Sequence, residues 1–190
     1  MTVYLKDVKD ERVLHTLEHD DRINCAAFSS DDSKLAMGTR RKVCIWDTET
    51  EQLARTLPAL RGVDFVAFSP DASKITYGSG YSAQTWDLQR NERLPREIHH
   101  LDDINALAYS PDSCTFISGS RDATLKIWNA ETVTPLETRE VSSIVLSLAF
   151  SPASTGPGAR LLASGLGFPN LCVKIWDTVT WTIVKTLPGY

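Results

Sequence analysis

Apolar and polar residues alternate in short stretches along most of the chain, a pattern typical of half-buried β-strands. Residues 104–110, 114–119 and 123–128 show it clearly, and the turn-forming segment Pro111-Asp112-Ser113 separates the first two. A fourth, more charged stretch over 135–140 suits a strand at a solvent-facing edge. No longer stretch follows the period of a helix. We therefore expect an all-β structure.

This strand pattern recurs along the chain. The tripeptide Ala-Phe-Ser or Ala-Tyr-Ser begins at Ala27, Ala67, Ala108 and Ala149, at intervals of 40, 41 and 41 residues. A Trp-Asp or Trp-Asn pair begins at Trp46, Trp86, Trp128 and Trp176, at intervals of 40, 42 and 48 residues. Because two independent markers share one period, the chain is predicted to contain four copies of one structural unit.

The repeated unit resembles the WD-repeat (β-transducin-like) family over nearly the whole chain. The resemblance is carried by the period near 40, the strand that ends in Trp-Asp, and the segment Ala-Phe-Ser-Pro-Asp. It implies a β-propeller, in which four-stranded antiparallel blades pack face to face around a channel. We expect about four blades, over residues 18–57, 58–98, 99–140 and 141–190.

Residues 1–17 are predicted to form half of a preceding blade. An offset of 40 residues aligns Val3 with Val43, and Leu5 with Ile45. Propellers of this family most often resemble closed rings of about seven blades. Three alternatives follow for a partial propeller: missing blades in a longer chain, a homodimer that completes a ring, or a small or open propeller. The sequence does not choose between them.

Blades of this family are often held by a buried, hydrogen-bonded set of His, Ser or Thr, Asp and Trp. The positions in the third unit hold His100, Ser118, Asp122 and Trp128. In the first unit, Met37 and Arg40 occupy the Ser and Asp positions. The His and Asp positions hold Ala59 and Gly80 in the second unit, and Val141 and Asn170 in the fourth. We expect the third blade to be the best ordered and the others to depend on apolar packing.

Composition narrows the function. With 20 Lys and Arg against 24 Asp and Glu, the net charge is -4, which argues against charge-driven binding to nucleic acid. No apolar run approaches the ~20 residues that cross a bilayer, and no secretory signal pattern begins the chain. We therefore expect neither a nucleic-acid nor a membrane partner. The four cysteines form no C-x-x-C pair and are predicted to be buried, reduced thiols, which favours the cytoplasm or nucleus.

One rim of such a propeller carries the turns between the second and third strands and the links between blades. The resemblance implies that partners bind there, and it places Arg40, Arg41, Arg61, Tyr81, Arg121 and Phe168 on this rim. Arginine and aromatic residues are enriched at binding hot spots. Arginines from adjacent blades would suit an acidic or phosphorylated protein segment. Each residue taken singly is also an ordinary solvated turn residue.

Neither a metal site, a cofactor nor catalysis is indicated. His99 and His100 are adjacent, so their side chains point to opposite faces of a strand. The chain has no phosphate-binding loop motif and no nucleophile-elbow motif. We predict a non-catalytic protein–protein interaction scaffold. The first alternative is a sensor or substrate-adaptor module within a larger multidomain WD-repeat protein, and a propeller enzyme is a distant one.

Two features stand outside the repeat. Trp181 breaks the pattern and is expected near an outer strand, where it could mark a contact surface. The segment 151–160 is longer than its counterparts and rich in Pro, Gly, Ser and Thr. It is expected to be a flexible insertion on the opposite rim.

Overall fold

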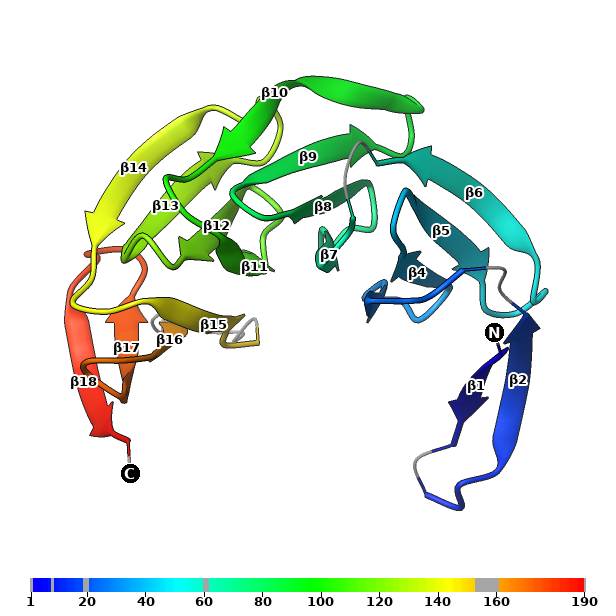
Figure 1. Ribbon diagram of the computed structural model, residues 1–190, viewed down its shortest axis with the longest axis horizontal. Helices are drawn as coiled ribbons and strands as arrows, with labels where there is room; N and C mark the ends of the chain where they lie inside the picture. The colour runs from blue at the N-terminus through cyan, green and yellow to red at the C-terminus, as the bar shows by residue number, and fades with distance from the viewer. Residues whose placement is uncertain (1, 8, 19–20, 60–61, 153–160, 190) are drawn as a thin grey trace.

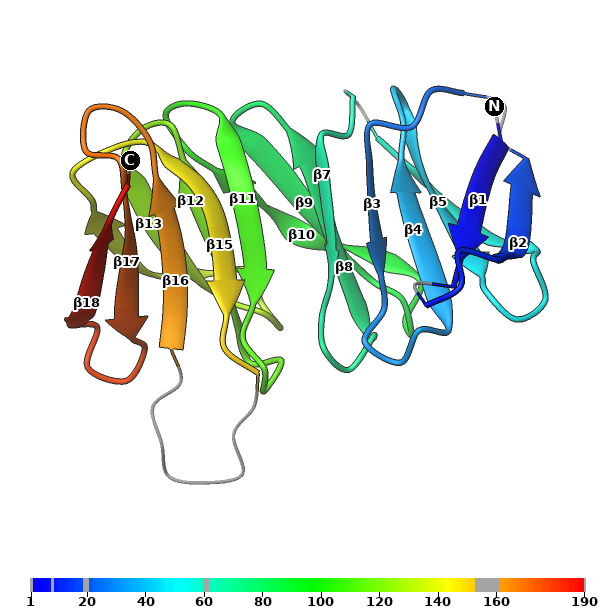
Figure 2. The ribbon, with the colours of Figure 1, turned by 90° about the horizontal axis from the view of Figure 1, so that it is seen from below.

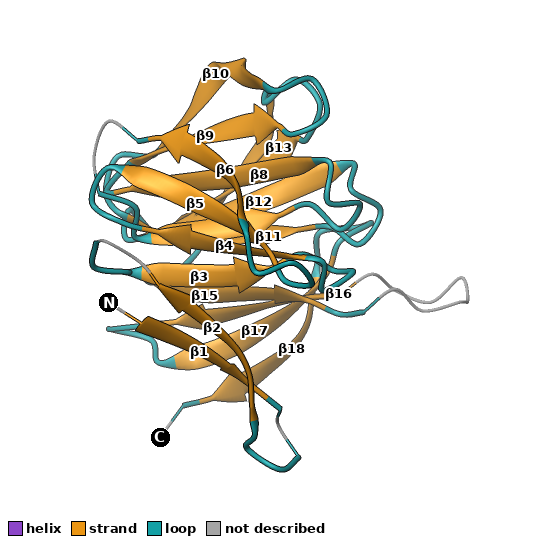
Figure 3. Cartoon of the chain, turned by 90° about the vertical axis from the view of Figure 1, so that its right-hand side faces the viewer, coloured by secondary structure: helices purple, strands orange, loops and turns teal. Residues whose placement is uncertain are grey.

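The computed structural model describes residues 2–7, 9–18, 21–59, 62–152 and 161–189 of the chain. These residues form strands and turns, and no helix among them is long and apolar enough to cross a membrane (Figure 3). An antiparallel pair, β1 (Thr2–Lys6) and β2 (Val13–Glu18), precedes four antiparallel sheets of four strands each. The predicted all-β fold of four four-stranded units and a preceding half unit is thus confirmed.

The four sheets follow one another in chain order. The first contains β3 (Cys25–Phe28), β4 (Lys34–Gly38), β5 (Lys42–Asp47) and β6 (Leu53–Pro58). The second contains β7 (Phe65–Phe68), β8 (Lys74–Ser79), β9 (Ser82–Asp87) and β10 (Glu92–His99). The third contains β11 (Ile104–Tyr109), β12 (Thr115–Ser120), β13 (Thr124–Asn129) and β14 (Pro135–Glu140). The fourth contains β15 (Val145–Phe150), β16 (Leu161–Leu166), β17 (Cys172–Asp177) and β18 (Ile183–Pro188).

The sheets stand side by side along an arc that does not close (Figure 1). The first strand of each sheet lies on the inside of the arc, and the last strand lies on the outside. The turns at the ends of the strands therefore gather on two opposite rims (Figure 2). We call the rim with the β4–β5, β8–β9, β12–β13 and β16–β17 turns the upper rim, and the opposite one the lower rim.

Apolar side chains between neighbouring sheets form the core. Between the first and second sheets, Val43 and Ile45 pack in one buried cluster with Phe68 and Ile75. The alternation of the strands explains this arrangement, because every second side chain points toward the next sheet. Burying each such side chain contributes on the order of 2 kcal/mol.

The boundary between the second and third sheets contains a polar link. The hydroxyl of Tyr109 lies 2.6 Å from Oγ1 of Thr76, which lies 2.8 Å from Oγ1 of Thr85. All three residues are buried, and burial raises the pKa of Tyr109. The three hydroxyl groups satisfy one another, so the two sheets are joined in one register.

The face of the fourth sheet that points away from the third sheet is more exposed than the equivalent face of the first sheet. Val43 in β5 and Leu57 in β6 pair across the first sheet and are 0% and 1% exposed. The equivalent pair in the fourth sheet is Val173 and Leu187, and Leu187 is 40% exposed. No further sheet of the described chain packs against this face.

The repeated Trp-Asp pair has a local structural role. The side chain of Asp47, at the end of β5, accepts hydrogen bonds from the backbone amides of Glu49 and Thr50. Asp87 and Asp177 bind the turns after β9 and β17 in the same way, and Asn129 binds the turn after β13. These caps fix the tight turn that leads into the outer strand of each sheet.

The prediction that all four cysteines are buried is wrong for Cys114. Cys44 is buried, and Cys25 and Cys172 are half-buried, whereas Cys114 is exposed in the turn before β12. An apolar strand pattern begins directly after this residue, at Thr115, so the sequence pattern extends one residue too far. None of the four cysteines forms a disulfide.

Candidate functional site

The third sheet brings together the four residues predicted as a hydrogen-bonded set. His100 lies in the link before β11, Ser118 in β12, Asp122 in the β12–β13 turn and Trp128 in β13. Nε1 of Trp128 donates to Oγ of Ser118 over 2.8 Å, and Nε2 of His100 lies 2.7 Å from the same oxygen. Nδ1 of His100 lies 3.0 Å from Oδ2 of Asp122. The set thus ties the upper rim to the sheet.

The protonation of this set follows from its geometry. Burial lowers the pKa of His100, although Asp122 acts to raise it. The neutral ring then donates from Nδ1 to Asp122 and accepts the Ser118 hydroxyl proton at Nε2, an assignment that satisfies every polar group. Burial alone would raise the pKa of Asp122, but hydrogen bonds from Thr124 and from the backbone of Leu101 lower it to about 2.

The first sheet lacks the equivalent network. Met37 takes the register position of Ser118, since it pairs with Cys44 as Ser118 pairs with Lys126. Nε1 of Trp46 is consequently buried without a hydrogen-bond partner among the described residues. His19 directly follows β2 in the sequence, as His100 directly follows β10, but it lies outside the described residues.

The fourth sheet keeps part of the set. Nε1 of Trp176 donates to Oγ of Ser164 over 2.9 Å, and both residues are buried. The backbone amide of Asn170 donates to Oγ of the buried Ser143. The fourth sheet therefore adds these two hydrogen bonds to its apolar packing.

The candidate partner-binding residues lie in turns of the upper rim. The exposed Arg40 and Arg41 are in the β4–β5 turn, Tyr81 is in the β8–β9 turn, and the exposed Arg121 is in the β12–β13 turn. Phe168 is in the β16–β17 turn and is 79% exposed. Arg61 lies outside the described residues.

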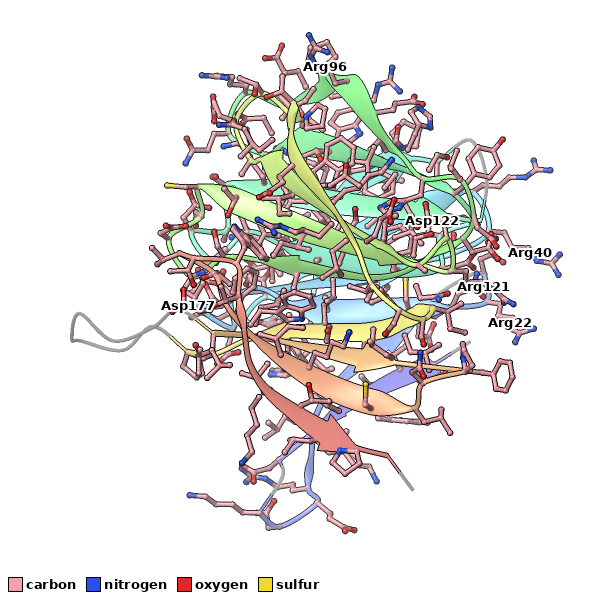
Figure 4. The ribbon with its side chains drawn as sticks, turned by 90° about the vertical axis from the view of Figure 1, so that its left-hand side faces the viewer. Arg22, Arg40, Arg96, Arg121, Asp122 and Asp177 are labelled. Carbon is pink, nitrogen blue, oxygen red and sulfur yellow. The ribbon has the colours of Figure 1, made fainter. Side chains whose placement is uncertain are left out.

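Three arginines mark this rim in Figure 4. Arg22, Arg40 and Arg121 lie along one edge of the molecule, whereas Asp177 lies at the opposite edge and Arg96 lies on the outside of the arc. Arg22 belongs to the link before β3. The arginines come from different sheets, so the folded chain, and not a local run of basic residues, brings them to one edge.

The short turns hold these side chains outward. Gly80 and Tyr81 connect β8 to β9 between the paired residues Ser79 and Ser82. Gly80 has φ of 58°, a conformation that costs glycine little and allows this two-residue turn. The backbone amide of His100 donates to the carbonyl of Tyr81, which joins the turn to the next link.

A cavity of about 250 Å³ opens beside Tyr81, and we call it the rim cavity. Tyr77, Gln84, Glu97 and His99 also line it. The hydroxyl of Tyr77 and Nε2 of Gln84 both donate to the carbonyl of Pro58. Glu97 binds Arg93 at 2.8 Å and lies 3.5 Å from Nε2 of His99. The sequence does not reveal this cavity, since its walls come from strands and links far apart in the repeat.

The exposed candidate residues of the upper rim are of types that bind partner molecules. The described residues contain no group of three side chains placed to hold a metal ion. His100 and Asp122, whose pKa values are both lowered, are bound to one another inside the sheet. The exposed candidate residues are arginines and aromatic rings, which bind partners through charge, hydrogen bonds and contact area.

Comparisons with known proteins match this architecture. A family described as "WD domain, G-beta repeat" matches residues 11–47 and 93–129. The second match ends at the residue after Trp128, and the first ends at the residue after Trp46.

The chain is also similar to several curated plant proteins. It is 29% identical over 183 residues to the "B-type cell cycle switch protein ccs52A" of Medicago truncatula, which covers 94% of this chain and 38% of that protein. It is 36% identical over 84 residues to "Protein FIZZY-RELATED 1" of Arabidopsis thaliana, covering 44% of this chain and 17% of that protein. With "Protein FIZZY-RELATED 2" the identity is 33% over 89 residues, which cover 18% of that protein. The chain therefore spans less than two fifths of the length of each relative.

Proposed function

Since the chain belongs to the WD-repeat (β-transducin-like) β-propeller family, we propose that it is a non-catalytic scaffold that binds partner proteins through its upper rim. The observation that carries this proposal is the placement of Arg40, Arg121 and Phe168 in turns of the first, third and fourth sheets on one rim. We propose that its structural units are residues 1–17, 18–57, 58–98, 99–140 and 141–190.

We further propose that the partner segment is acidic or phosphorylated. Arginine forms bidentate hydrogen bonds with carboxylates and phosphates, and several arginines on one rim can hold more than one such group. Phe168 and Tyr81 supply exposed aromatic area on the same rim. Acidic residues such as Asp102 and Asp103 interrupt the rim, so the attraction is expected to be local.

A peptide array tests this proposal. Acidic, phosphorylated, neutral and basic peptides would be probed with the chain and with the double variant Arg40→Glu, Arg121→Glu. We expect the double variant to lose at least about 10-fold in affinity for the acidic and phosphorylated peptides. The double variant Arg12→Glu, Arg96→Glu has the same net charge and changes exposed arginines away from the upper rim, so it should bind normally. Equal binding by both double variants would refute the acidic-partner proposal.

A sensor or substrate-adaptor role within a larger WD-repeat protein is the second candidate. The similarity to a cell cycle switch protein over 94% of the chain favours it. An adaptor must hold two partners at once, whereas a simple binding module needs to hold only one. If two partners of the rim are found, gel filtration of the mixture would distinguish a ternary complex from competition.

A cytoplasmic or nuclear location is part of the proposal. The four cysteines form no disulfide, as expected of a chain in a reducing compartment. Fluorescence microscopy of the tagged chain would test the location.

A further inference from the structure

A second cavity, of about 460 Å³, lies on the lower rim between the third and fourth sheets. Its apolar walls are formed by Leu136, Phe150, Val179 and Trp181. Asp112 and Glu137 also line it, and Oδ1 of Asp112 accepts hydrogen bonds from Oγ of Ser110 and from the backbone amide of Cys114. We call this cavity the third groove, because it occupies the third of the three boundaries between neighbouring four-stranded sheets.

The equivalent place in the first boundary is filled by the chain itself. Arg55 pairs with Ile45, the residue before Trp46, and Glu137 pairs with Ile127, the residue before Trp128. Arg55 and Glu137 therefore share one register position. Nη1 of Arg55 reaches across to the second sheet and donates to the carbonyl of Leu88 over 2.9 Å. A guanidinium thus closes the first boundary.

The second boundary is closed by an apolar side chain. The pairing of β10 with β9 is irregular between Arg93 and Glu97, so Leu94, Pro95 and Arg96 together lie opposite Thr85, the residue before Trp86. Leu94 is 5% exposed and packs in one cluster with Ala130 and Val133 of the third sheet. The third boundary differs from both, because Glu137 is shorter than arginine and Leu136 is 55% exposed, and both residues line a cavity.

The residues across the third boundary match those that Arg55 meets across the first. Leu88 follows Asp87 in the second sheet, and Thr178 follows Asp177 in the fourth. Thr178 lines the third groove. A guanidinium in the third groove would therefore face the same part of the repeat that binds Arg55.

The charge of the third groove suits a cation. Among the described residues, its lining includes two carboxylates and no basic side chain. Nη2 of Arg139 binds Oε1 of Glu137 at 2.6 Å, and its guanidinium lies 5.8 Å from the ring centroid of Trp181. Arg139 neutralises part of the acidic charge, but a carboxylate has about four acceptor sites and can bind a second guanidinium. Trp181 is half-buried and adds an aromatic wall, which favours a flat cation.

We propose that the third groove is a binding site for an arginine side chain of an extended segment in a partner protein. The guanidinium enters between the sheets as Arg55 does in the first boundary and binds Glu137, while Asp112 adds negative charge to the groove. Apolar residues that flank the arginine contact the exposed Leu136 and Val179. This site lies on the rim opposite Arg40 and Arg121, so it goes beyond the proposed function of the upper rim.

Binding of a short peptide tests the site. The probe is the acetylated, amidated tripeptide Leu-Arg-Leu, with the same tripeptide carrying citrulline in place of arginine as its uncharged counterpart. Binding to the full chain is followed by the NMR signal of the Trp181 indole, assigned with Trp181→Phe. We expect the arginine peptide to shift this signal and to bind at least about 10-fold more tightly than the citrulline peptide.

Variants of the chain separate the proposed contacts from general effects. Glu137→Gln should lower the affinity for the arginine peptide about 5-fold to 10-fold, and Val179→Ala, at an exposed position, should lower it less. Glu140→Gln, at an exposed position of the same strand, should leave binding unchanged. Glu137→Arg should abolish binding and raise the melting temperature, because it restores the side chain found in the first boundary.

Two results would overturn the proposal. One is equal affinity for the arginine and citrulline peptides, and the other is unchanged affinity in Glu137→Gln. Binding of Leu-Arg-Leu should also survive in Arg40→Glu, Arg121→Glu. The upper rim and the third groove can therefore fail independently.

Discussion

The first and third sheets share the same strand order, register and tryptophan position. They differ in the surroundings of the tryptophan's indole nitrogen. In the third sheet Trp128 donates to Ser118, which is bound to His100 and through it to Asp122. In the first sheet Trp46 occupies the equivalent position, but its indole nitrogen is buried without a partner among the described residues. Met37, which is 0% exposed, replaces the serine with an apolar contact to Leu17 and Leu35.

The difference shows that the repeat tolerates two ways of holding a sheet. A complete polar set fixes one geometry because each member satisfies another. An apolar substitute keeps the packing, but the indole nitrogen of Trp46 then has no partner among the described residues, and an unsatisfied buried polar atom costs about 1–3 kcal/mol. The sheet geometry is therefore set by the strand pattern, and the polar set adds stability and order to the upper rim.

Removal of Ser118 should have the largest effect on this comparison. Ser118→Ala leaves both Nε1 of Trp128 and Nε2 of His100 without their partner in a buried place. We expect a loss of about 3 kcal/mol in the free energy of unfolding, measured by urea titration. Ser164→Ala in the fourth sheet removes the partner of Trp176 alone and should cost about 1.5 kcal/mol. Equal losses in the two variants would contradict the network interpretation.

Introduction of a serine into the first sheet should not create the missing set. Met37→Ser offers Trp46 a hydroxyl, worth about 1 kcal/mol, but it removes a fully buried side chain whose truncation costs about 2–5 kcal/mol. We expect a net loss of about 2 kcal/mol by the same urea titration. A gain in stability would mean that the buried indole nitrogen costs far more than the packing of Met37 contributes.

Much of the fold could be predicted from the sequence because the repeat supplies several copies of each signal. The alternation predicted the strands of the third sheet to within a residue, as seen for Pro135–Glu140. The positions of His100, Ser118, Asp122 and Trp128 followed from one motif, since their spacing is fixed by strand length. Cys114 was misplaced because a period of two does not mark where a strand begins.

The cavities could not be predicted in the same way. The third groove depends on Glu137, which lies at the register position that Arg55 occupies in the first sheet. This equivalence becomes visible only when the register of the outer strands is known. Those strands carry the weakest repeat signal, because their side chains face solvent. Trp181 was singled out as a break in the pattern, and its place in the wall of the third groove gives that break a structural context. The role of the upper-rim residues stays a prediction.

A smaller effect is expected from the titration of His100, which should make the melting temperature fall in acid. Burial lowers the pKa of His100 in the folded chain, so the unfolded chain binds a proton more readily. Stability is then fully present above about pH 6.5 and falls as the pH drops below that value. We expect the melting temperature of His100→Asn to depend less on pH between 7.5 and 5.5 than that of the parent chain. His99→Asn, at the exposed neighbour, should keep the parent slope.

The smallest effect on stability is expected from substitution of Trp46, whose indole nitrogen has no partner among the described residues. Trp46→Phe removes a buried nitrogen that has no partner among the described residues, and it also removes some apolar contact area. The two changes have opposite signs and similar size, so we expect the free energy of unfolding to change by less than about 1 kcal/mol. Trp128→Phe removes the same atoms from a place where the nitrogen is bound to Ser118, and it should cost about 2 kcal/mol or more. If Trp46→Phe were as costly as Trp128→Phe, the indole nitrogen of Trp46 would have to be satisfied in solution. The first and third sheets would then differ in the identity of the partner and not in its presence.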